Sequence, residues 1–184
     1  MSTILETDRL ILRNYKESDI DDYFEYMQNK KVCSMAGMIP CYTKEKAINL
    51  LKMDSMEKFQ FAIVLKEINK VIGSIGIMKY LNSNRDDIKE IAFLLSEKYW
   101  GQGIMTEALK EITRYTFEDL NASEVHIRCA EANIGSQRTQ EKCGFEIAHN
   151  LHNSSIFIDG VLSNIIERVM TKEEYFEKSK NKRK

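Results

Sequence analysis

The spacing of apolar and polar residues near the start of the chain predicts one strand and two helices. Residues 5–14 alternate enough between apolar and polar side chains to form an opening strand. After an N-cap at 18–19, apolar residues recur three and four positions apart, as on one face of a helix: Ile20, Tyr23, Phe24 and Met27. Residues 32–42 are expected to form a loop, and Thr43 is expected to cap the second helix.

The centre of the chain is predicted to form buried strands. Two nearly continuous apolar runs, 61–65 and 71–78, are typical of strands that are covered on both faces. Gly73 and Gly76 within the second run indicate a bulge or the close approach of another group. A third apolar run at 91–95 follows a polar loop and predicts a further strand.

This third run leads into the segment Lys98-Tyr99-Trp100-Gly101-Gln102-Gly103, and a helix-patterned stretch at 104–120 leaves it. Two glycines one residue apart allow the backbone to turn its N–H groups toward one point. The unsatisfied N–H groups and the positive dipole end of the following helix lie at the same point. The segment therefore predicts an anion site, for which phosphate is the usual occupant.

Two familiar phosphate-binding motifs do not fit this loop. A P-loop requires Lys and then Ser or Thr after its last glycine, where this chain has Ile104 and Met105. A dinucleotide-binding fingerprint requires a third Gly or Ala, where this chain has Thr106, and it usually follows the first strand of its fold. Because glycine also marks ordinary tight turns, the loop taken alone leaves that interpretation open.

The second half of the chain adds another motif. A strand at 125–129, in which His126 and Arg128 mark a wetter side, is followed by a short helix that starts at Asn133 and is capped by Gly144. Strands near 145–149 and 156–170 follow, the latter with a turn at Asp159-Gly160.

Together the two motifs resemble those of the GNAT superfamily of N-acetyltransferases. The family's acetyl-CoA loop has the form Q/R-x-x-G-x-G/A, which Lys98, Gly101 and Gly103 match with a lysine in the first place. The family's later segment runs N-x-x-S and then E-K-x-G-F, which Asn133, Ser136 and 141–145 match. Further matches resemble the RimJ/RimL-like branch, which includes ribosomal-protein-alanine N-acetyltransferases: Glu6-Thr7-Asp8-Arg9-Leu10-Ile11-Leu12-Arg13, Glu90-Ile91, Tyr99-Trp100-Gly101 and Thr106-Glu107-Ala108.

The resemblance covers roughly residues 5–175 and implies an α/β (α+β) fold. The expected architecture is a GNAT-like mixed, mostly antiparallel sheet of about seven strands flanked by about four helices. A splayed gap between the strand before the glycine loop and the strand at 125–129 would form the cofactor slot. The chain of 184 residues is expected to form one domain over 1–175, followed by a basic C-terminal tail at 176–184, of which 178–184 is expected to be solvated and disordered.

The resemblance also implies acetyl-CoA as the co-substrate. In the family, the main chain of the strand before the loop binds the pantetheine arm and the acetyl oxygen, and the loop binds the pyrophosphate. The residues implied here are Phe93, Leu94, Leu95, Lys98, Tyr99, Trp100, Gly101, Gln102, Gly103, Ile104, Asn133, Ser136 and Lys142. The alternatives are plain core side chains for Phe93 and Leu95, a solvated surface lysine for Lys98 and a simple N-cap for Asn133.

Acetyl transfer requires a neutral amine and benefits from a proton or hydrogen bond for the departing thiolate. Ser136 is the candidate for the thiolate, because many family members have a tyrosine where this chain has Gln140 and the resembled branch often uses a serine. The alternative for Ser136 is a helix-start or solvent-facing role. Glu90 is the candidate general base, directly or through a water. The alternative is that Glu90 is an ordinary surface glutamate without a catalytic role. Glu131 is a weaker candidate, and His126 is expected to be a satisfied surface histidine.

Composition limits the partners. A net charge of −1 gives no broad basic surface for nucleic acid. The longest uncharged stretch, 32–43, is too short to span a bilayer, and charges within the first twenty residues argue against a secretory signal. Four cysteines without C-x-x-C spacing are typical of reduced thiols, and the three scattered histidines add no metal-binding pattern. The expected protein is cytoplasmic, a monomer or homodimer, without metal, membrane or nucleic-acid partner.

The leading hypothesis is an acetyl-CoA-dependent N-acetyltransferase that acts on a primary amine, with a protein N-terminal amine as one candidate acceptor. A small-molecule amine, such as a polyamine, an amino acid or an antibiotic, is the alternative acceptor. A non-catalytic CoA-binding module is a further alternative, because the tyrosine acid is absent.

Overall fold

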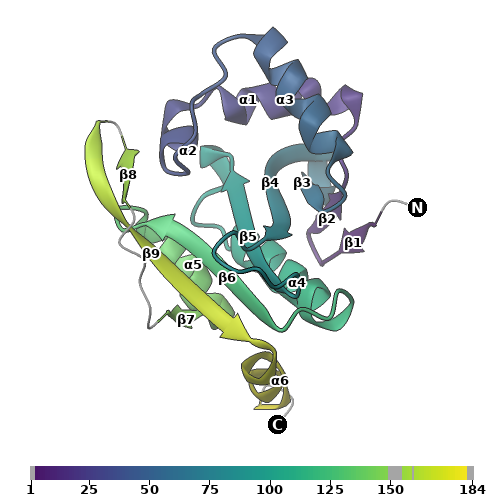
Figure 1. The fold of residues 1–184 in the computed structure, drawn as a ribbon. Coiled ribbons are helices and arrows are strands. Elements are labelled where there is room, and N and C mark those ends of the chain that lie inside the picture. The colour runs from purple at the N-terminus through teal and green to yellow at the C-terminus, as the bar shows by residue number, and fades with distance from the viewer. Residues whose placement is uncertain (1–2, 149–154, 159, 182–184) are drawn as a thin grey trace.

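The computed structural model describes residues 3–148, 155–158 and 160–181, and within them nine strands and six α-helices form one layered body (Figure 1). The strands are β1 (Leu5–Glu6), β2 (Leu10–Arg13), β3 (Gln60–Leu65), β4 (Lys70–Lys79), β5 (Ile88–Leu95), β6 (Glu124–Ala130), β7 (Glu146–Ile147), β8 (Ser155–Ile158) and β9 (Val161–Thr171). The helices are α1 (Ile20–Met27), α2 (Lys30–Ser34), α3 (Lys44–Met56), α4 (Ile104–Glu118), α5 (Ile134–Cys143) and α6 (Lys172–Asn181).

The strands follow the order β1-β2-β3-β4-β5-β6-β9-β7, and β8 pairs with β9. Every pair is antiparallel except β5 and β6, which run parallel. The mixed, mostly antiparallel α/β sheet is therefore confirmed. More strands are present than expected, because the opening segment turns at Thr7, whose N–H bonds to the Leu10 carbonyl, and forms two strands instead of one.

Two further helices explain why the expected number of four was too low. Residues 32–42 were expected to form a loop, but α2 occupies Lys30–Ser34, because the Asn29 side chain caps the N–H groups of Lys31 and Val32. Disorder was expected for the basic tail, but α6 extends through Asn181. It is held by Lys178, whose Nζ donates to the Gly144 carbonyl at 2.8 Å. Residues 182–184, His149 and Asp159 of the predicted turn lie outside the described residues.

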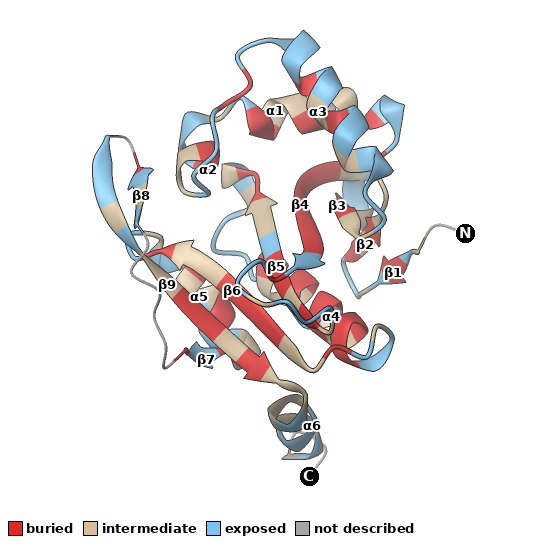
Figure 2. Ribbon diagram, viewed as in Figure 1, coloured by how far each residue is buried: buried red, intermediate tan, exposed pale blue. Residues whose placement is uncertain are grey.

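Helices cover both faces of the sheet (Figures 1 and 2). Phe61 and Ile63 of β3 pack in the cluster that contains the buried side of α4. Ala62 and Val64, which alternate with them, pack with α1 and α3 on the other face. The prediction that β3 and β4 are covered on both faces is confirmed, and no helix in the described part of the chain is both long and apolar enough to cross a membrane.

The feature that prepares the site is the separation of β5 from β6. The two strands pair only at Ile88 with Glu124, Lys89 with Val125 and Glu90 with His126. Beyond this point β5 continues beside β4 and β6 continues beside β9. The expected splayed gap between these strands is therefore present.

Gly73 allows β4 to approach β5 closely beside this gap. A Cβ atom on Gly73 would lie 2.3 Å from the Leu94 carbonyl oxygen, and one on Gly76 would lie 2.0 Å from the Gln60 side chain. The register between β3 and β4 also shifts at Ile63 and Val64, opposite Gly73. Both predictions for the glycines of this strand, a bulge and a close approach, are confirmed.

We predict that Gly73→Ala lowers the free energy of unfolding by about 1–3 kcal/mol, because the new methyl group meets backbone that cannot rotate away. Gly135→Ala is the matched control: Gly135 lies in α5, its nearest neighbour would be 3.8 Å from the new Cβ, and alanine favours a helix. Urea unfolding of both variants checks the difference. A Gly73→Ala variant as stable as the wild type would contradict the close approach.

Candidate active site

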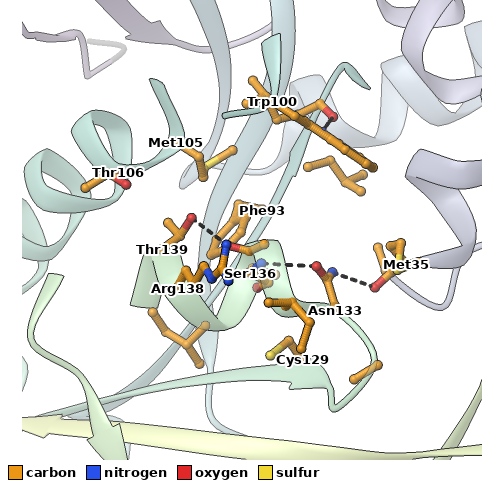
Figure 3. Close-up of a pocket in the computed structure, with 18 of the residues that line it drawn as sticks. Met35, Phe93, Trp100, Met105, Thr106, Cys129, Asn133, Ser136, Arg138 and Thr139 are labelled. Atoms are coloured by element: carbon orange, nitrogen blue, oxygen red, sulfur yellow. Dashed lines mark hydrogen bonds between the residues drawn. The ribbon is translucent and has the colours of Figure 1, made fainter. Parts of the chain in front are cut away.

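A cavity of about 810 Å³ opens where β5 and β6 separate (Figure 3). Its walls come from β5, the glycine loop, the first turn of α4, β6 and the start of α5. Met35 from the segment after α2 and Ile156 from β8 also line it. The volume lies in the range of sites for drug-sized ligands and cofactors.

The glycine loop forms one end of this cavity. Gly101 and Gly103 have φ values of 75° and 74°, in the left-handed region where a side chain is disfavoured. Gly103 is also the N-cap of α4, so no side chain caps the first N–H groups of that helix. The Trp100 indole donates to the Leu95 carbonyl at 2.8 Å and ties the loop to the end of β5. The result is a helix N-terminus with open backbone donors that faces a cavity, which suits an anion.

Two predicted cofactor residues do not line the cavity. Lys98 turns its Nζ to the Glu25 carboxylate at 2.6 Å, and this contact helps Lys70 to lower the pKa of Glu25. The Gln102 side chain donates to the Lys98 carbonyl at 2.9 Å. The other residues implied by the resemblance do line the cavity: Phe93, Leu94, Leu95, Tyr99, Trp100, Gly101, Gly103, Ile104, Asn133, Ser136 and Lys142.

Asn133 fixes the start of α5 at the opposite wall. Its side-chain oxygen accepts from the Ser136 N–H at 3.1 Å, and its amide donates to the Met35 carbonyl at 3.1 Å (Figure 3). The first contact is the N-cap that the sequence indicated. The second joins α5 to the segment after α2 across the cavity, so Asn133 also shapes the cavity's width.

Ser136 lies one turn into the same wall, and only 9% of its surface is exposed. Its Oγ accepts a hydrogen bond from Nε2 of the fully buried Gln140 at 3.0 Å, and the serine keeps a proton of its own to donate. Cys129 lies beside both residues. Burial raises the pKa of the Cys129 thiol, although hydrogen bonds with Ser136 and Gln140 oppose that effect.

Glu90 lies at the point where β5 and β6 separate, and it is bonded twice. Nε and Nη2 of Arg128 each donate to one Glu90 oxygen at 2.9 Å. The pair raises the pKa of Arg128, chiefly through these hydrogen bonds. Among the described residues that line the cavity, Glu90 supplies the one carboxylate. A bidentate ion pair therefore joins the two strands just where their backbone pairing ends.

His126 is buried, which corrects the expectation of a surface position. Its Nδ1 lies 2.7 Å from Glu167, its Nε2 lies 2.5 Å from Glu124, and its ring stacks on Tyr80 at 3.8 Å between centroids. Both ring nitrogens of His126 therefore have hydrogen-bond partners, as expected, but the sequence did not indicate which residues these partners are. Glu131 is exposed and lies outside the cavity lining, where it accepts from Asn164.

Sequence reasoning missed three arginines of this region. Arg128 was noted only as part of the wetter side of its strand. Arg138 lines the cavity from α5, and its place between Ser136 and the end of the helix carried no further signal. Arg9 belongs to a matched segment to which no role was assigned. No group of three or more His, Cys, Asp and Glu side chains within the described ranges is placed to hold a metal ion.

Comparisons with known proteins agree with this arrangement. The family model described as an acetyltransferase (GNAT) domain matches residues 9–146. The uncharacterised N-acetyltransferase YnaD of Bacillus subtilis is 29% identical over 145 residues, covering 76% of this chain and 81% of YnaD. A GNAT-family acetyltransferase from Bacillus anthracis has a TM-score of 0.82 at 22% identity, covering 94% of this chain and 100% of that chain. The spermidine N-acetyltransferase of Vibrio cholerae, solved with CoA and spermine, has a TM-score of 0.76 at 17% identity. This match covers 92% of this chain and 99% of that chain.

We predict that replacing Gly101 and Gly103 together by valine weakens CoA binding by at least about 10-fold, because side chains strain the left-handed backbone and obstruct its donors. Gly160→Val is the control. Gly160 has a similar φ of 83° and open space around it, but it lies outside the cavity lining. Calorimetric titration with CoA measures both variants. Unchanged affinity in the double variant would remove the loop from the cofactor site.

Proposed function

The chain belongs to the GNAT acetyltransferase family, and we propose that it transfers the acetyl group of acetyl-CoA to the α-amine of a protein or peptide N-terminus, as in the RimJ/RimL-like branch. The observation that carries the proposal is a cavity with an uncapped glycine-loop helix at one end and the Glu90–Arg128 pair at the other. A small-molecule amine is the competing acceptor.

The residues present fit acetyl-CoA. The backbone donors at Gly103 and the start of α4 suit the pyrophosphate, and the unpaired edge of β5 at Phe93, Leu94 and Leu95 suits the pantetheine arm. Arg138 and Lys142 line the cavity from α5 and add positive charge for the anionic ligand. The fit therefore relies mainly on backbone groups, and the side chain of Lys98 is not required for it.

Ser136 is proposed to donate a hydrogen bond to the sulfur of the departing CoA. Because Gln140 donates to its Oγ, the serine hydroxyl is positioned by a buried neighbour, and in the proposed reaction its proton turns from the Cys129 sulfur to the departing thiolate. A donor that meets charge developing on the sulfur contributes more in the transition state than in the ground state.

We predict that Ser136→Ala lowers kcat by about 10- to 1000-fold with little change in CoA affinity. Thr139→Val is the control, since Thr139 lines the same cavity but its hydroxyl is engaged with the Gly135 carbonyl at 2.9 Å. Steady-state release of CoA thiol, with calorimetry for affinity, gives both quantities. A fully active alanine variant would exclude the serine from the reaction.

The state of Glu90 favours an N-terminal α-amine as the acceptor. Each Glu90 oxygen accepts one hydrogen bond from Arg128 and keeps a further lone pair, but a proton taken up by Glu90 would remove the charge that holds this ion pair. An α-amine, with a pKa near ~8, is partly neutral at pH 7, whereas a lysine or polyamine amine near ~10 is almost fully protonated. Proton uptake by Glu90, directly or through a water, would therefore weaken its link to Arg128, and this favours an acceptor amine that needs less help from a base.

We predict that Glu90→Gln slows the acetylation of high-pKa amines more than that of peptide N-termini and moves the rising limb of the kcat/KM profile to higher pH. Arg128→Met is the matched variant, because it removes the ion pair and keeps the carboxylate. If Glu90 is a base, Arg128→Met acetylates high-pKa amines better than Glu90→Gln does, because it keeps the carboxylate that accepts the proton. If both variants lose activity alike and the limb stays in place, Glu90 acts through the ion pair alone.

A panel of acceptors tests the function as a whole. Peptides with free and blocked N-termini, free lysine and spermidine are offered with acetyl-CoA, and products are located by mass spectrometry. Acetylation confined to free peptide N-termini supports the proposal. Preferred acetylation of spermidine or free lysine would contradict the proposal and indicate a small-molecule amine as the acceptor.

A further inference from the structure

Two segments that match the family in sequence, but have no role in the site described above, meet behind the glycine loop. Thr7 and Arg9 come from the turn between β1 and β2, and Glu107 lies in the first turn of α4. Thr7 Oγ1 donates to Glu107 Oε1 at 2.6 Å. The backbone N–H of Arg9 donates to the same oxygen at 2.9 Å, and Arg9 Nε donates to Oε2 at 2.6 Å.

These contacts fix the direction of the Arg9 guanidinium. Burial opposes ionisation of Glu107, but the hydrogen bonds from Thr7 and Arg9 outweigh it and lower the pKa of Glu107. The carboxylate is therefore charged at neutral pH and holds Arg9 by its Nε edge. The remaining edge of the guanidinium points to the loop, where Nη1 donates to the Gln102 carbonyl at 3.1 Å.

This last contact sets the orientation of one peptide group. In a trans peptide the carbonyl and the following N–H point in opposite directions. A Gln102 carbonyl that is bonded to Arg9 therefore turns the Gly103 N–H away from Arg9. Gly103 lines the cavity, and Arg9 is not among the residues that line it.

Without such a contact the peptide group between Gln102 and Gly103 could take another orientation. Gly101 and Gly103 flank the Gln102 residue, and glycine rotates at low cost. Rotation of the peptide between Gln102 and Gly103 would turn a carbonyl oxygen toward the cavity and present negative charge to an anionic ligand. Arg9 opposes that rotation from outside the cavity.

We propose that Arg9 is a positioning residue for the pyrophosphate of CoA, acting through the Gln102 carbonyl to direct the Gly103 N–H into the cavity; this rests on the proposed function. It assigns one purpose to both matched segments, the one around Arg9 and the one around Glu107. It also separates the role of Arg9 from that of a cation that touches the ligand.

The experiment compares Arg9→Met and Arg9→Lys in the full chain by calorimetric titration with three probes: CoA, 3′-dephospho-CoA and pantetheine. Both variants are expected to bind CoA and 3′-dephospho-CoA about 10- to 100-fold more weakly, and pantetheine with unchanged affinity. Lysine keeps the charge but lacks the planar fork by which Nε and Nη1 of Arg9 reach Glu107 and the Gln102 carbonyl in fixed directions.

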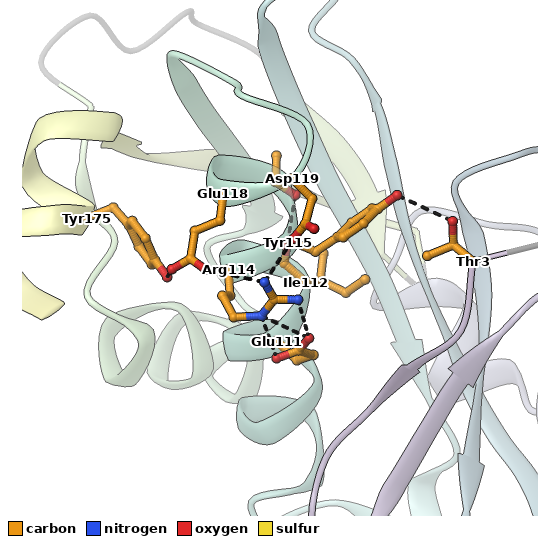
Figure 4. Close-up of polar contacts among 9 residues, drawn as sticks. Thr3, Glu111, Ile112, Arg114, Tyr115, Glu118, Asp119 and Tyr175 are labelled. Carbon is orange, nitrogen blue, oxygen red and sulfur yellow. Dashed lines mark hydrogen bonds and ion pairs between the residues drawn. The ribbon is translucent and has the colours of Figure 1, made fainter.

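Arg114→Met is the matched control on the same helix. Arg114 bonds Glu111, Glu118 and Asp119 near the far end of α4, beside the Tyr175 contact to Glu118 (Figure 4). Its loss removes charged hydrogen bonds from α4 without reaching the glycine loop, so all three probes should bind as they do to the wild type. Glu107→Gln is a second variant, in which Arg9 is anchored more weakly. It should weaken the binding of CoA and 3′-dephospho-CoA by a smaller factor than the Arg9 variants do and leave pantetheine binding unchanged.

Each other outcome overturns the proposal in a distinct way. Equal weakening of all three probes would indicate general distortion. Full CoA affinity in Arg9→Lys would indicate an effect of charge alone. Full affinity for CoA in Arg9→Met would indicate that the glycine loop keeps its backbone orientation without the contact from Arg9. A wild-type chain that binds none of the probes would overturn the proposed function, and this inference with it.

Discussion

The parting of β5 and β6 after Glu90 and His126 is the constraint on which the rest of the structure depends. Two strands that separate inside a protein leave backbone donors and acceptors without partners, and each buried one costs about 1–3 kcal/mol. A ligand that forms hydrogen bonds with the unpaired strand edges would therefore stabilise the gap. The pantetheine arm of CoA has two amides that can form such bonds. The Glu90–Arg128 ion pair supplies a side-chain link at the fork itself.

Packing on both sides keeps the gap at a fixed width. Gly73 brings β4 against the Leu94 carbonyl, so β5 cannot move toward β4. On the other side β6 is paired with β9 over its whole length, and Lys178 of α6 holds the end of α5 through the Gly144 carbonyl. Asn133 then bridges from α5 to the Met35 carbonyl. The walls are therefore fixed by contacts behind β5 and β6 and by the Asn133–Met35 bridge within the cavity lining.

The sequence predicted the parts of the fold that depend on neighbouring residues. Thr43 accepts from the Lys46 N–H as an N-cap, and Gly144 takes a left-handed φ of 92° at the end of α5. It could not predict contacts that depend on the tertiary arrangement. Glu90 and Arg128 are 38 residues apart, and their ion pair follows from where two strands diverge rather than from any local pattern. The disorder expected for the tail was wrong for the same reason, because α6 is stabilised by its docking, as in the stacking of Tyr175 on Phe117.

The position of Lys98 bears on how the proposed cofactor site would recognise its ligand. The family's loop begins with a residue able to bond a phosphate, but here that lysine pairs with Glu25, and the cationic side chains that line the cavity, Arg138 and Lys142, come from α5 instead. Backbone donors are effective only when their peptide groups are held in one orientation, since flexible glycines would otherwise scatter them. The residues that hold the loop then matter more than a cation beside it: Trp100 through the Leu95 carbonyl, and Arg9 through the Gln102 carbonyl, which is 93 residues away in sequence. Under the proposed function, such a loop would depend on side chains that hold its backbone as well as on the side chains that line the cavity.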